Sequence, residues 1–75
     1  MPARVLVRYL SGEIREELAY IDPDVDDGAV YCPSGFRIEF GPGGEYTVCR
    51  DAFRIRRRGD RILLEEIGYY RERIA

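Results

Sequence analysis

One stretch of the chain decides the fold: Phe53-Arg54-Ile55-Arg56-Arg57-Arg58-Gly59-Asp60-Arg61-Ile62-Leu63-Leu64-Glu65-Glu66-Ile67. Apolar and charged side chains alternate at its start, which is typical of a half-buried strand. Gly59-Asp60 can form a two-residue turn. Pairing across that turn sets three pairs of residues opposite each other: Arg58 with Arg61, Ile55 with Leu64, and Arg54 with Glu65. The sequence therefore predicts a β-hairpin whose second strand runs to about Ile67.

A helix is the alternative for the second half of this stretch. Asp60 is a suitable N-cap, and apolar residues recur after it at helical spacing, at Leu63, Ile67, Tyr70 and Ile74. Gly68 lies in the middle of that pattern and weakens a helix, so we favour the strand. The pattern leaves open whether Tyr69 to Ala75 is strand, helix or disordered.

Length and composition indicate one small domain, residues 1–75. A chain of 75 residues has a thin core, and an apolar fraction of 45% argues against disorder. No apolar run approaches the roughly 20 residues of a membrane span, and no signal peptide precedes the first expected strand. We therefore expect a cytoplasmic protein without a membrane partner.

The net charge of −2 conceals a segregation of charge along the chain. Gly12 to Asp27 contains seven acidic residues and one arginine, whereas Arg50 to Arg61 contains six arginines and two acidic residues. Segments of opposite charge can pair within one domain or across a subunit interface. All twelve basic residues are arginines, which a GC-rich genome or selection for bidentate cations at interfaces would explain.

The sequence of the N-terminal half predicts strands joined by turns. Arg4 to Leu10 is rich in β-branched and aromatic residues and predicts a strand. Ser11-Gly12 is a candidate two-residue turn, which would set Leu10 opposite Glu13. The segment from Glu13 to Ile21 fits a helix or a long bent strand, and the tight turn before it favours the strand. Asp22 to Gly28 is a loop, because proline and glycine punctuate it.

The middle of the chain predicts two short strands, Ala29 to Cys32 and Phe36 to Phe40, or one strand broken at Pro33-Ser34-Gly35. Gly41-Pro42-Gly43-Gly44 is then a hairpin loop, and its length decides which side chains face inward. A five-residue loop pairs apolar residues with apolar ones, Phe40 with Tyr46 and Ile38 with Val48. A four-residue loop would instead direct Thr47 and Cys49 inward. We therefore expect the five-residue loop.

Residues for catalysis and metal binding are scarce. Histidine is absent, which removes the commonest general base and the commonest metal ligand. We therefore expect no enzyme and no cofactor. Cys32 and Cys49 match no zinc or redox spacing. We expect two free thiols in a cytoplasmic protein, with a disulfide as the alternative.

The acidic loop resembles a calcium-binding loop in its aspartates but not in the rest of the pattern. Its aspartates are Asp22, Asp24, Asp26 and Asp27. The EF-hand pattern requires glycine at position six and glutamate at position twelve, where this chain has Asp27 and Pro33. We therefore interpret the segment as a solvated loop without a metal, whose aspartates cap nearby backbone amides.

Five to seven short strands joined by glycine-rich turns predict an all-β fold, a small barrel or roll of the SH3 type. Two stretches also resemble the bipartite signature of the Sm-like family. The first is Val5-Leu6-Val7-Arg8-Tyr9-Leu10-Ser11-Gly12-Glu13 followed by Leu18-Ala19-Tyr20-Ile21-Asp22, and the second is Ile55-Arg56-Arg57-Arg58-Gly59-Asp60-Arg61-Ile62.

The Sm-like resemblance implies a five-stranded, strongly bent barrel whose subunits join into rings around single-stranded, uridine-rich RNA. Arg58 would clamp a base, Asp60 would support the pocket, and the loop from Asp22 to Asp26 would complete it. The family usually has asparagine where this chain has Asp26. Carboxylates in that loop oppose the attraction of phosphate that dominates nucleic-acid affinity.

Two functions follow as expectations. The first is a non-catalytic interaction module, an accessory or regulatory protein that docks on a protein partner or forms a homo-oligomer. The alternative is an Sm-like single-stranded RNA-binding ring, with Tyr9, Tyr46 or Phe53 stacking on bases, which the acidic isoelectric point disfavours. Both use the arginine-rich strand, with contact residues Arg54, Arg56, Arg57, Arg58, Asp60 and Arg61.

Overall fold

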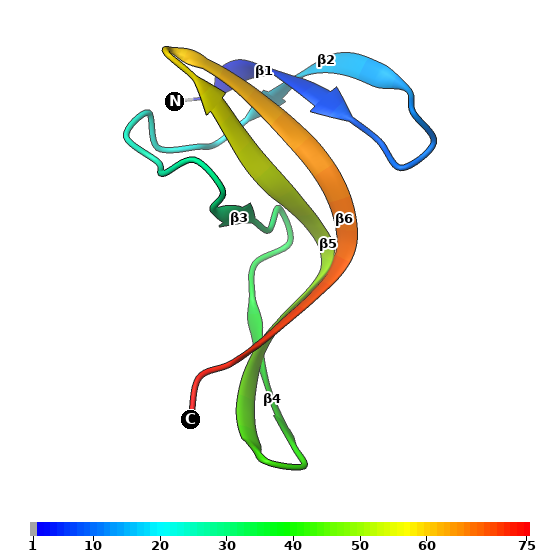
Figure 1. Cartoon of the computed structure of the whole chain (residues 1–75), viewed down its shortest axis with the longest axis vertical. Helices are drawn as coiled ribbons and strands as arrows, with labels where there is room; N and C mark the ends of the chain where they lie inside the picture. The colour runs from blue at the N-terminus through cyan, green and yellow to red at the C-terminus, as the bar shows by residue number, and fades with distance from the viewer. Residues whose placement is uncertain (1) are drawn as a thin grey trace.

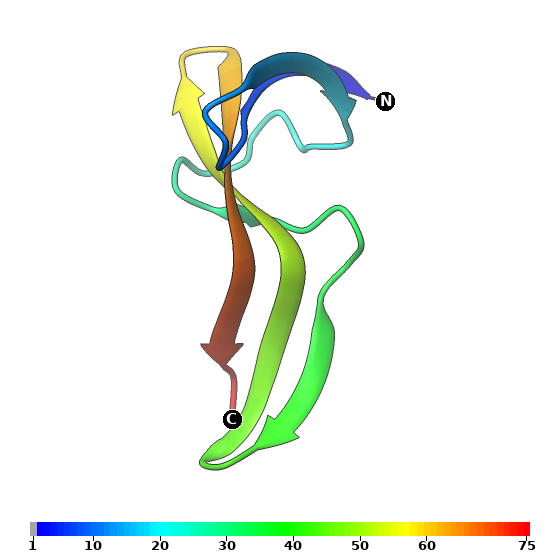
Figure 2. The same ribbon diagram turned by 90° about the vertical axis from the view of Figure 1, so that its right-hand side faces the viewer.

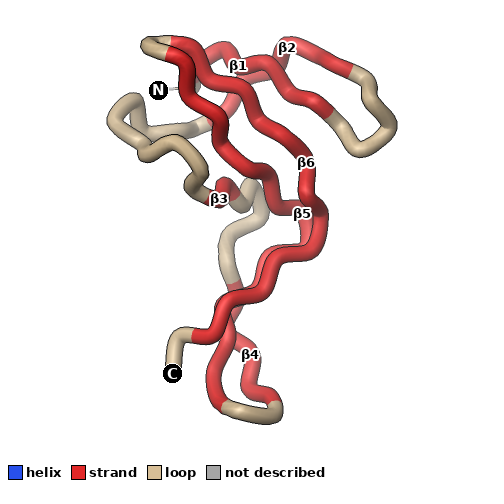
Figure 3. Tube along the Cα trace, viewed as in Figure 1, coloured by secondary structure: helices blue, strands red, loops and turns tan. Residues whose placement is uncertain are grey.

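The computed structural model describes residues 2–75 as one open, six-stranded β-sheet with no helix (Figures 1 and 3). The strands are β1 (Ala3–Arg8), β2 (Ile14–Ala19), β3 (Val30–Tyr31), β4 (Arg37–Gly41), β5 (Gly44–Arg58) and β6 (Arg61–Arg73). Their order is β2-β1-β6-β5-β3, with β4 also paired to β5. The prediction of a small all-β fold is confirmed, but the sheet does not close into a barrel. In this part of the chain no helix is long and apolar enough to cross a membrane.

The hairpin of β5 and β6 runs the whole length of the molecule, which measures 38 × 28 × 19 Å (Figure 1). Its register confirms the predicted one: Arg58 faces Arg61, Ile55 faces Leu64, and Arg54 faces Glu65. The helical alternative is wrong. The second strand continues beyond the expected end at Ile67 to Arg73, so the segment after Tyr69 is mostly strand.

Two bulges that compensate each other bend this hairpin near its middle. Between the pairs Cys49–Tyr70 and Ala52–Gly68, β5 contains one residue more than β6. Between Ala52–Gly68 and Phe53–Glu66, β6 contains one residue more than β5. Gly68 has a φ of +76°, a conformation that is costly for any residue with a Cβ atom. Because the extra residue in β5 and the extra residue in β6 offset each other, the pairing register is the same on both sides of the bend.

The core lies in the upper part of the molecule, above the bend. β1 runs parallel to β6 there and antiparallel to β2, and together with β5 they curve around a cluster of five buried side chains: Val5, Val7, Ala19, Ile55 and Leu64. The segment with β3 closes one side of this cluster (Figure 3). Below the bend, β4, β5 and β6 form a three-stranded sheet without a second layer (Figure 2).

The first turn differs from its predicted form by one residue. The Tyr9 amide donates to the Glu13 carbonyl at 2.9 Å, so the turn is a three-residue loop from Leu10 to Gly12 rather than Ser11-Gly12 alone. Gly12 adopts a φ of +90°, as glycine does in three-residue hairpin loops. The strand predicted for the segment after the turn is confirmed as β2. Its apolar residues Ile14 and Leu18 point outward.

The second turn is also shorter than predicted. Gly41 pairs with Gly44, which leaves Pro42-Gly43 as a two-residue turn with Gly43 at a φ of +89°. Proline followed by glycine at positive φ is the signature of a type II turn. The expected five-residue loop is therefore wrong, and the predicted pairs with Tyr46 and Val48 do not form. Phe40 lies opposite Glu45, and β4 keeps its apolar side chains exposed.

Cys32 and Cys49 form a disulfide, with an S–S distance of 2.06 Å and a Cα–Cα distance of 6.0 Å. The expectation of two free thiols is wrong, because the pairing of β3 and β4 with the same strand brings the cysteines together. The bond joins the segment between β3 and β4 to β5 beside the bend. Ser34 donates a hydrogen bond of 2.7 Å to Asp51 in the bulge, which ties the same segment down a second time.

Removing the disulfide should destabilise the fold strongly. It closes a loop of 17 residues, for which loop entropy predicts a contribution of about 3 kcal/mol. We expect the double substitution Cys32→Ser and Cys49→Ser to lower the free energy of unfolding in urea by about that amount. Intact mass under denaturing conditions should show the loss of two hydrogens in the wild type. Two reactive thiols in the folded wild-type protein would contradict this.

Candidate functional site

The arginines of β5 divide between the two faces of the upper sheet. Side chains alternate along a strand, and the register places Arg56 beside Leu63, which in turn lies beside Leu6 of β1. Leu6 is exposed, whereas its neighbours Val5 and Val7 are buried, so this side of the sheet is the outer one. Arg54, Arg56 and Arg58 belong to the outer face and Arg57 to the inner one.

Arg57 anchors the acidic loop. Its backbone amide donates to Asp27 Oδ1 at 2.8 Å, and its Nη1 donates to the Val25 carbonyl at 3.1 Å. Arg54 has a similar role, because its Nη1 donates to the Gly28 carbonyl at 2.7 Å. Both guanidinium groups are half-buried and engaged within the chain. Two of the predicted contact residues thus hold the loop against β5.

Two of the four aspartates of the acidic loop, Asp22 and Asp27, cap backbone amides, as predicted from the sequence. Asp22 Oδ1 accepts from the Asp24 amide at 2.8 Å, and Asp27 accepts from Arg57 as described above. Asp24 and Asp26 are exposed. Within residues 2–75, the one set of three possible metal ligands with converging atoms is Cys32, Cys49 and Asp51, and its two sulfurs are joined to each other.

An ion-pair cluster holds β1, β5 and β6 together on the outer face. Glu65 lies 2.8 Å from Arg56 Nε and 3.1 Å from Arg8 Nη1. The hydrogen bond from Arg56 lowers the pKa of the Glu65 carboxyl below its usual value, and the charges of Arg56, Arg8 and Arg58 act in the same direction. Arg56 is therefore neutralised in part, whereas Arg58 acts on Glu65 by its charge without forming an ion pair with it.

The outer face of the upper sheet is basic around an apolar centre, and we call it the basic sheet face. Its arginines are Arg4, Arg8, Arg54, Arg56, Arg58 and Arg61, against two acidic residues, Glu16 and Glu65. Its apolar centre is formed by Leu6, Leu18 and Leu63. Leu6 is 48% and Leu18 66% exposed. Arginine is enriched at protein interfaces, and the core of such an interface buries apolar side chains.

The tip of the hairpin carries two arginines that form no ion pair within residues 2–75. Arg58 and Arg61 lie directly opposite each other on either side of Gly59-Asp60. Like charges directly across a sheet destabilise it, so this pair costs stability. Two such residues are candidates for contact with another molecule.

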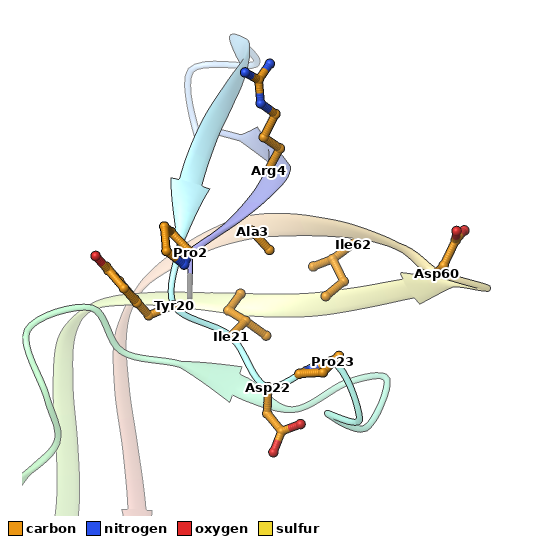
Figure 4. Close-up of a pocket in the computed structure, with 9 residues that line it drawn as sticks. All are labelled: Pro2, Ala3, Arg4, Tyr20, Ile21, Asp22, Pro23, Asp60 and Ile62. Atoms are coloured by element: carbon orange, nitrogen blue, oxygen red, sulfur yellow. The ribbon is translucent and has the colours of Figure 1, made fainter.

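An open pocket of about 670 Å³ lies beside the tip, between the start of β1 and the loop after β2 (Figure 4). Ala3, Ile21 and Ile62 form its apolar centre, with Asp22 and Asp60 on different sides. The pocket thus brings together the two segments that the Sm-like resemblance joins. Arg58, the residue expected to clamp a base, does not line it.

The aromatic residues predicted to stack on bases are already engaged. Tyr9 and Phe53 pack edge to face, with ring centroids 6.3 Å apart, against the core. Tyr46 lies under the guanidinium group of Arg71, 3.5 Å from its ring centroid. These three rings are therefore not free to stack on bases, whereas Tyr20, which lines the pocket beside the tip, is 74% exposed.

The exposure of the apolar side chains of the lower sheet was not predicted from the sequence. Phe36, Ile38 and Phe40 point to one side, as predicted, but they are 47%, 54% and 79% exposed. Pro42-Gly43 was the signal that could have revealed this, because a two-residue turn moves the register by one residue.

Comparison of the chain with models of protein families, with curated proteins and with solved structures found no match. The function is therefore inferred from the geometry and charge described above.

Arg57 and Arg58 should differ sharply when each is replaced by alanine. Arg57→Ala removes a half-buried charged donor from the acidic loop and should lower the free energy of unfolding by about 2 kcal/mol. Arg58→Ala should change it by less than about 0.5 kcal/mol. Hydrogen exchange measured by mass spectrometry should show faster exchange in residues 22–28 of the first variant alone. Equal effects of the two substitutions would show that Arg57 does not anchor the loop.

The lowered pKa of Glu65 should couple stability to pH. A carboxyl with a lower pKa in the folded state stabilises the protein above its unfolded-state pKa, and this contribution is lost as pH falls through the folded-state value. Side-chain NMR titration should show that Arg56→Ala raises the pKa of Glu65, whereas Arg15→Ala, at a remote exposed ion pair, leaves it unchanged. An unchanged pKa in Arg56→Ala would contradict the assigned cause.

Proposed function

We propose that the protein is a non-catalytic protein-interaction module, which docks through its basic sheet face onto an acidic and partly apolar surface of a partner protein. The pair Arg58–Arg61 carries the proposal. These two arginines lie opposite each other at a cost to stability and have no acidic partner within the described residues. Acidic groups on another protein would neutralise both.

The apolar centre of the basic sheet face supports a protein rather than a nucleic acid as the partner. Leu6 and Leu18 are large, exposed and adjacent to arginines. Phosphate contacts would use the arginines but would leave these leucines in water. Tyr9 and Phe53 pack against each other and are not free to stack on the bases of single-stranded RNA. RNA binding at an Sm-like site is the competing proposal.

The disulfide bears on where this interaction takes place. Disulfides form and persist mainly in oxidising compartments, whereas cytoplasmic thiols are kept reduced. The Cys32–Cys49 bond therefore weighs against the expected cytoplasmic location, and the partner is to be sought where the protein is oxidised.

A selection from a random peptide library displayed on phage tests the proposal without a known partner. Selection for binding to the oxidised protein should enrich peptides with acidic and large apolar residues. The double substitution Arg58→Glu and Arg61→Glu should weaken binding of a selected peptide at least about tenfold, or about 1.4 kcal/mol. Arg73→Glu, an exposed arginine at the other end of the molecule, serves as the control and should leave binding unchanged.

Two results would overturn the proposal. One is the enrichment of no acidic peptide, or of peptides that bind the double variant and the wild type equally. The other is a preference for labelled oligo-uridine over the selected peptides, with a steep loss of affinity as salt is added. That second result would replace protein docking with RNA binding.

A further inference from the structure

The strand β4 has an open edge at the end of the molecule opposite the basic sheet face. β4 pairs with β5 on one side, and no other strand of the described chain contacts it. Figure 2 shows β4 and β6 on opposite sides of β5, with the outer side of β4 free. In an antiparallel sheet every second residue of an edge strand directs its N–H and C=O groups away from the neighbouring strand. Such an edge is a template for pairing with another strand.

The sequence of this edge is symmetrical about its central residue. It reads Phe36-Arg37-Ile38-Glu39-Phe40, with a phenylalanine at each end and opposite charges on either side of Ile38. We propose that two copies of the chain join through antiparallel pairing of β4 with β4, about a twofold axis that passes through Ile38. This dimer goes beyond the docking function above and uses a different part of the surface.

Pairing about Ile38 matches every residue of the edge with a suitable one. Arg37 of each copy lies opposite Glu39 of the other, and Phe36 lies opposite Phe40. Cross-strand pairs of unlike charge and of aromatic side chains both stabilise a sheet. Arg37 forms no ion pair within the described residues, and Glu39 is 3.7 Å from the exposed Arg50. The second copy would thus supply the carboxylate that Arg37 lacks.

Neighbouring registers lack this match. An axis through Arg37 sets that residue opposite its own copy, and an axis through Glu39 does the same with two carboxylates. Like charges directly opposite each other are destabilising. The charge pattern therefore selects one register as well as one partner.

The exposed apolar side chains of this edge, Phe36 just before β4 and Ile38 and Phe40 within it, fit the same arrangement. Phe36, Ile38 and Phe40 lie on one side of the sheet, and the Phe36 ring contacts Tyr70 with centroids 6.2 Å apart. In the dimer the two rows of side chains become one continuous apolar strip across the joined sheets. Each row then shields part of the other from water, which no strand of a single chain does for β4.

The other open edge of the lower sheet does not suit a second copy. β6 ends there in Arg71-Glu72-Arg73, which is also symmetrical, but about a glutamate between two arginines. Antiparallel pairing about Glu72 sets glutamate opposite glutamate and Arg71 opposite Arg73. This edge therefore repels its own copy, and pairing through the lower sheet stops at a closed dimer instead of an open chain.

Charge exchange at two positions tests the dimer. Sedimentation and light scattering of the wild type should give twice the mass of one chain. Arg37→Glu alone sets two carboxylates opposite each other at both pairs and should weaken the dimer at least about tenfold. Glu39→Arg alone should do the same with two arginines. The double variant, with both substitutions, restores unlike pairs and should dimerise within about threefold of the wild type.

Mixing the two single variants gives the sharpest result. Each carries the charge that the other requires, so the mixture should form a heterodimer although each variant alone is monomeric. This outcome also shows that both variants are folded. Arg73→Glu, the same change of charge at the edge of β6, is the matched control and should leave the dimer intact.

Three results would overturn the inference: a monomeric wild type at concentrations up to about 1 mM, single variants that dimerise as well as the wild type, or a mixture and a double variant that both stay monomeric. The double substitution of Arg58 and Arg61 should not affect dimerisation. The variants at Arg58 and Arg61 therefore test the docking proposal, and the variants at Arg37 and Glu39 test the dimer, so that one can fail without the other.

Discussion

The pairing of β5 with β6 is the constraint on which the rest of the structure depends. Each remaining strand is attached to this hairpin, β1 and β3 above the bend, β4 below it, and β2 through β1. The two strands are longer than the small core requires, so they extend past it and form a second sheet. The bulges at Ala52 and Gly68 bend the hairpin between the two parts, and the Cys32–Cys49 disulfide fixes the bend from the side.

This architecture gives the molecule two ends with different chemistry. The upper end has a core and a basic outer face whose excess of arginine no second copy of that face could neutralise. The lower end has no second layer, and its edge strand carries a charge pattern that complements itself. One end therefore suits a different, acidic partner, and the other suits an identical chain. A dimer joined through β4 would carry two basic sheet faces, and a partner with two acidic sites would bind it with increased avidity.

The register of a strand pair could be predicted from the sequence where the local pattern and the long-range packing favour the same pairing. The alternation before Gly59 and the turn itself predicted the register of the central hairpin, because shifting that register would bury arginines. The turns at Gly12 and Gly43 were predicted with the wrong length, since a one-residue difference in loop length leaves the polar and apolar pattern of each strand intact. The disulfide depends on the pairing of two strands far apart in the chain, which spacing alone does not determine. The split of the arginines between loop anchors and the outer face depends on the same pairing.

Cross-strand nuclear Overhauser effects along β5 and β6 test the account most directly. The structure predicts contacts between paired residues above the bend, such as Ile55 and Leu64, and below it, such as Cys49 and Tyr70. Between them, at Asp51 and Ile67, the regular pattern should be interrupted and then resume in the same register. Contacts that end at Gly68, or that resume with a shifted register, would contradict a single hairpin as the scaffold of both surfaces.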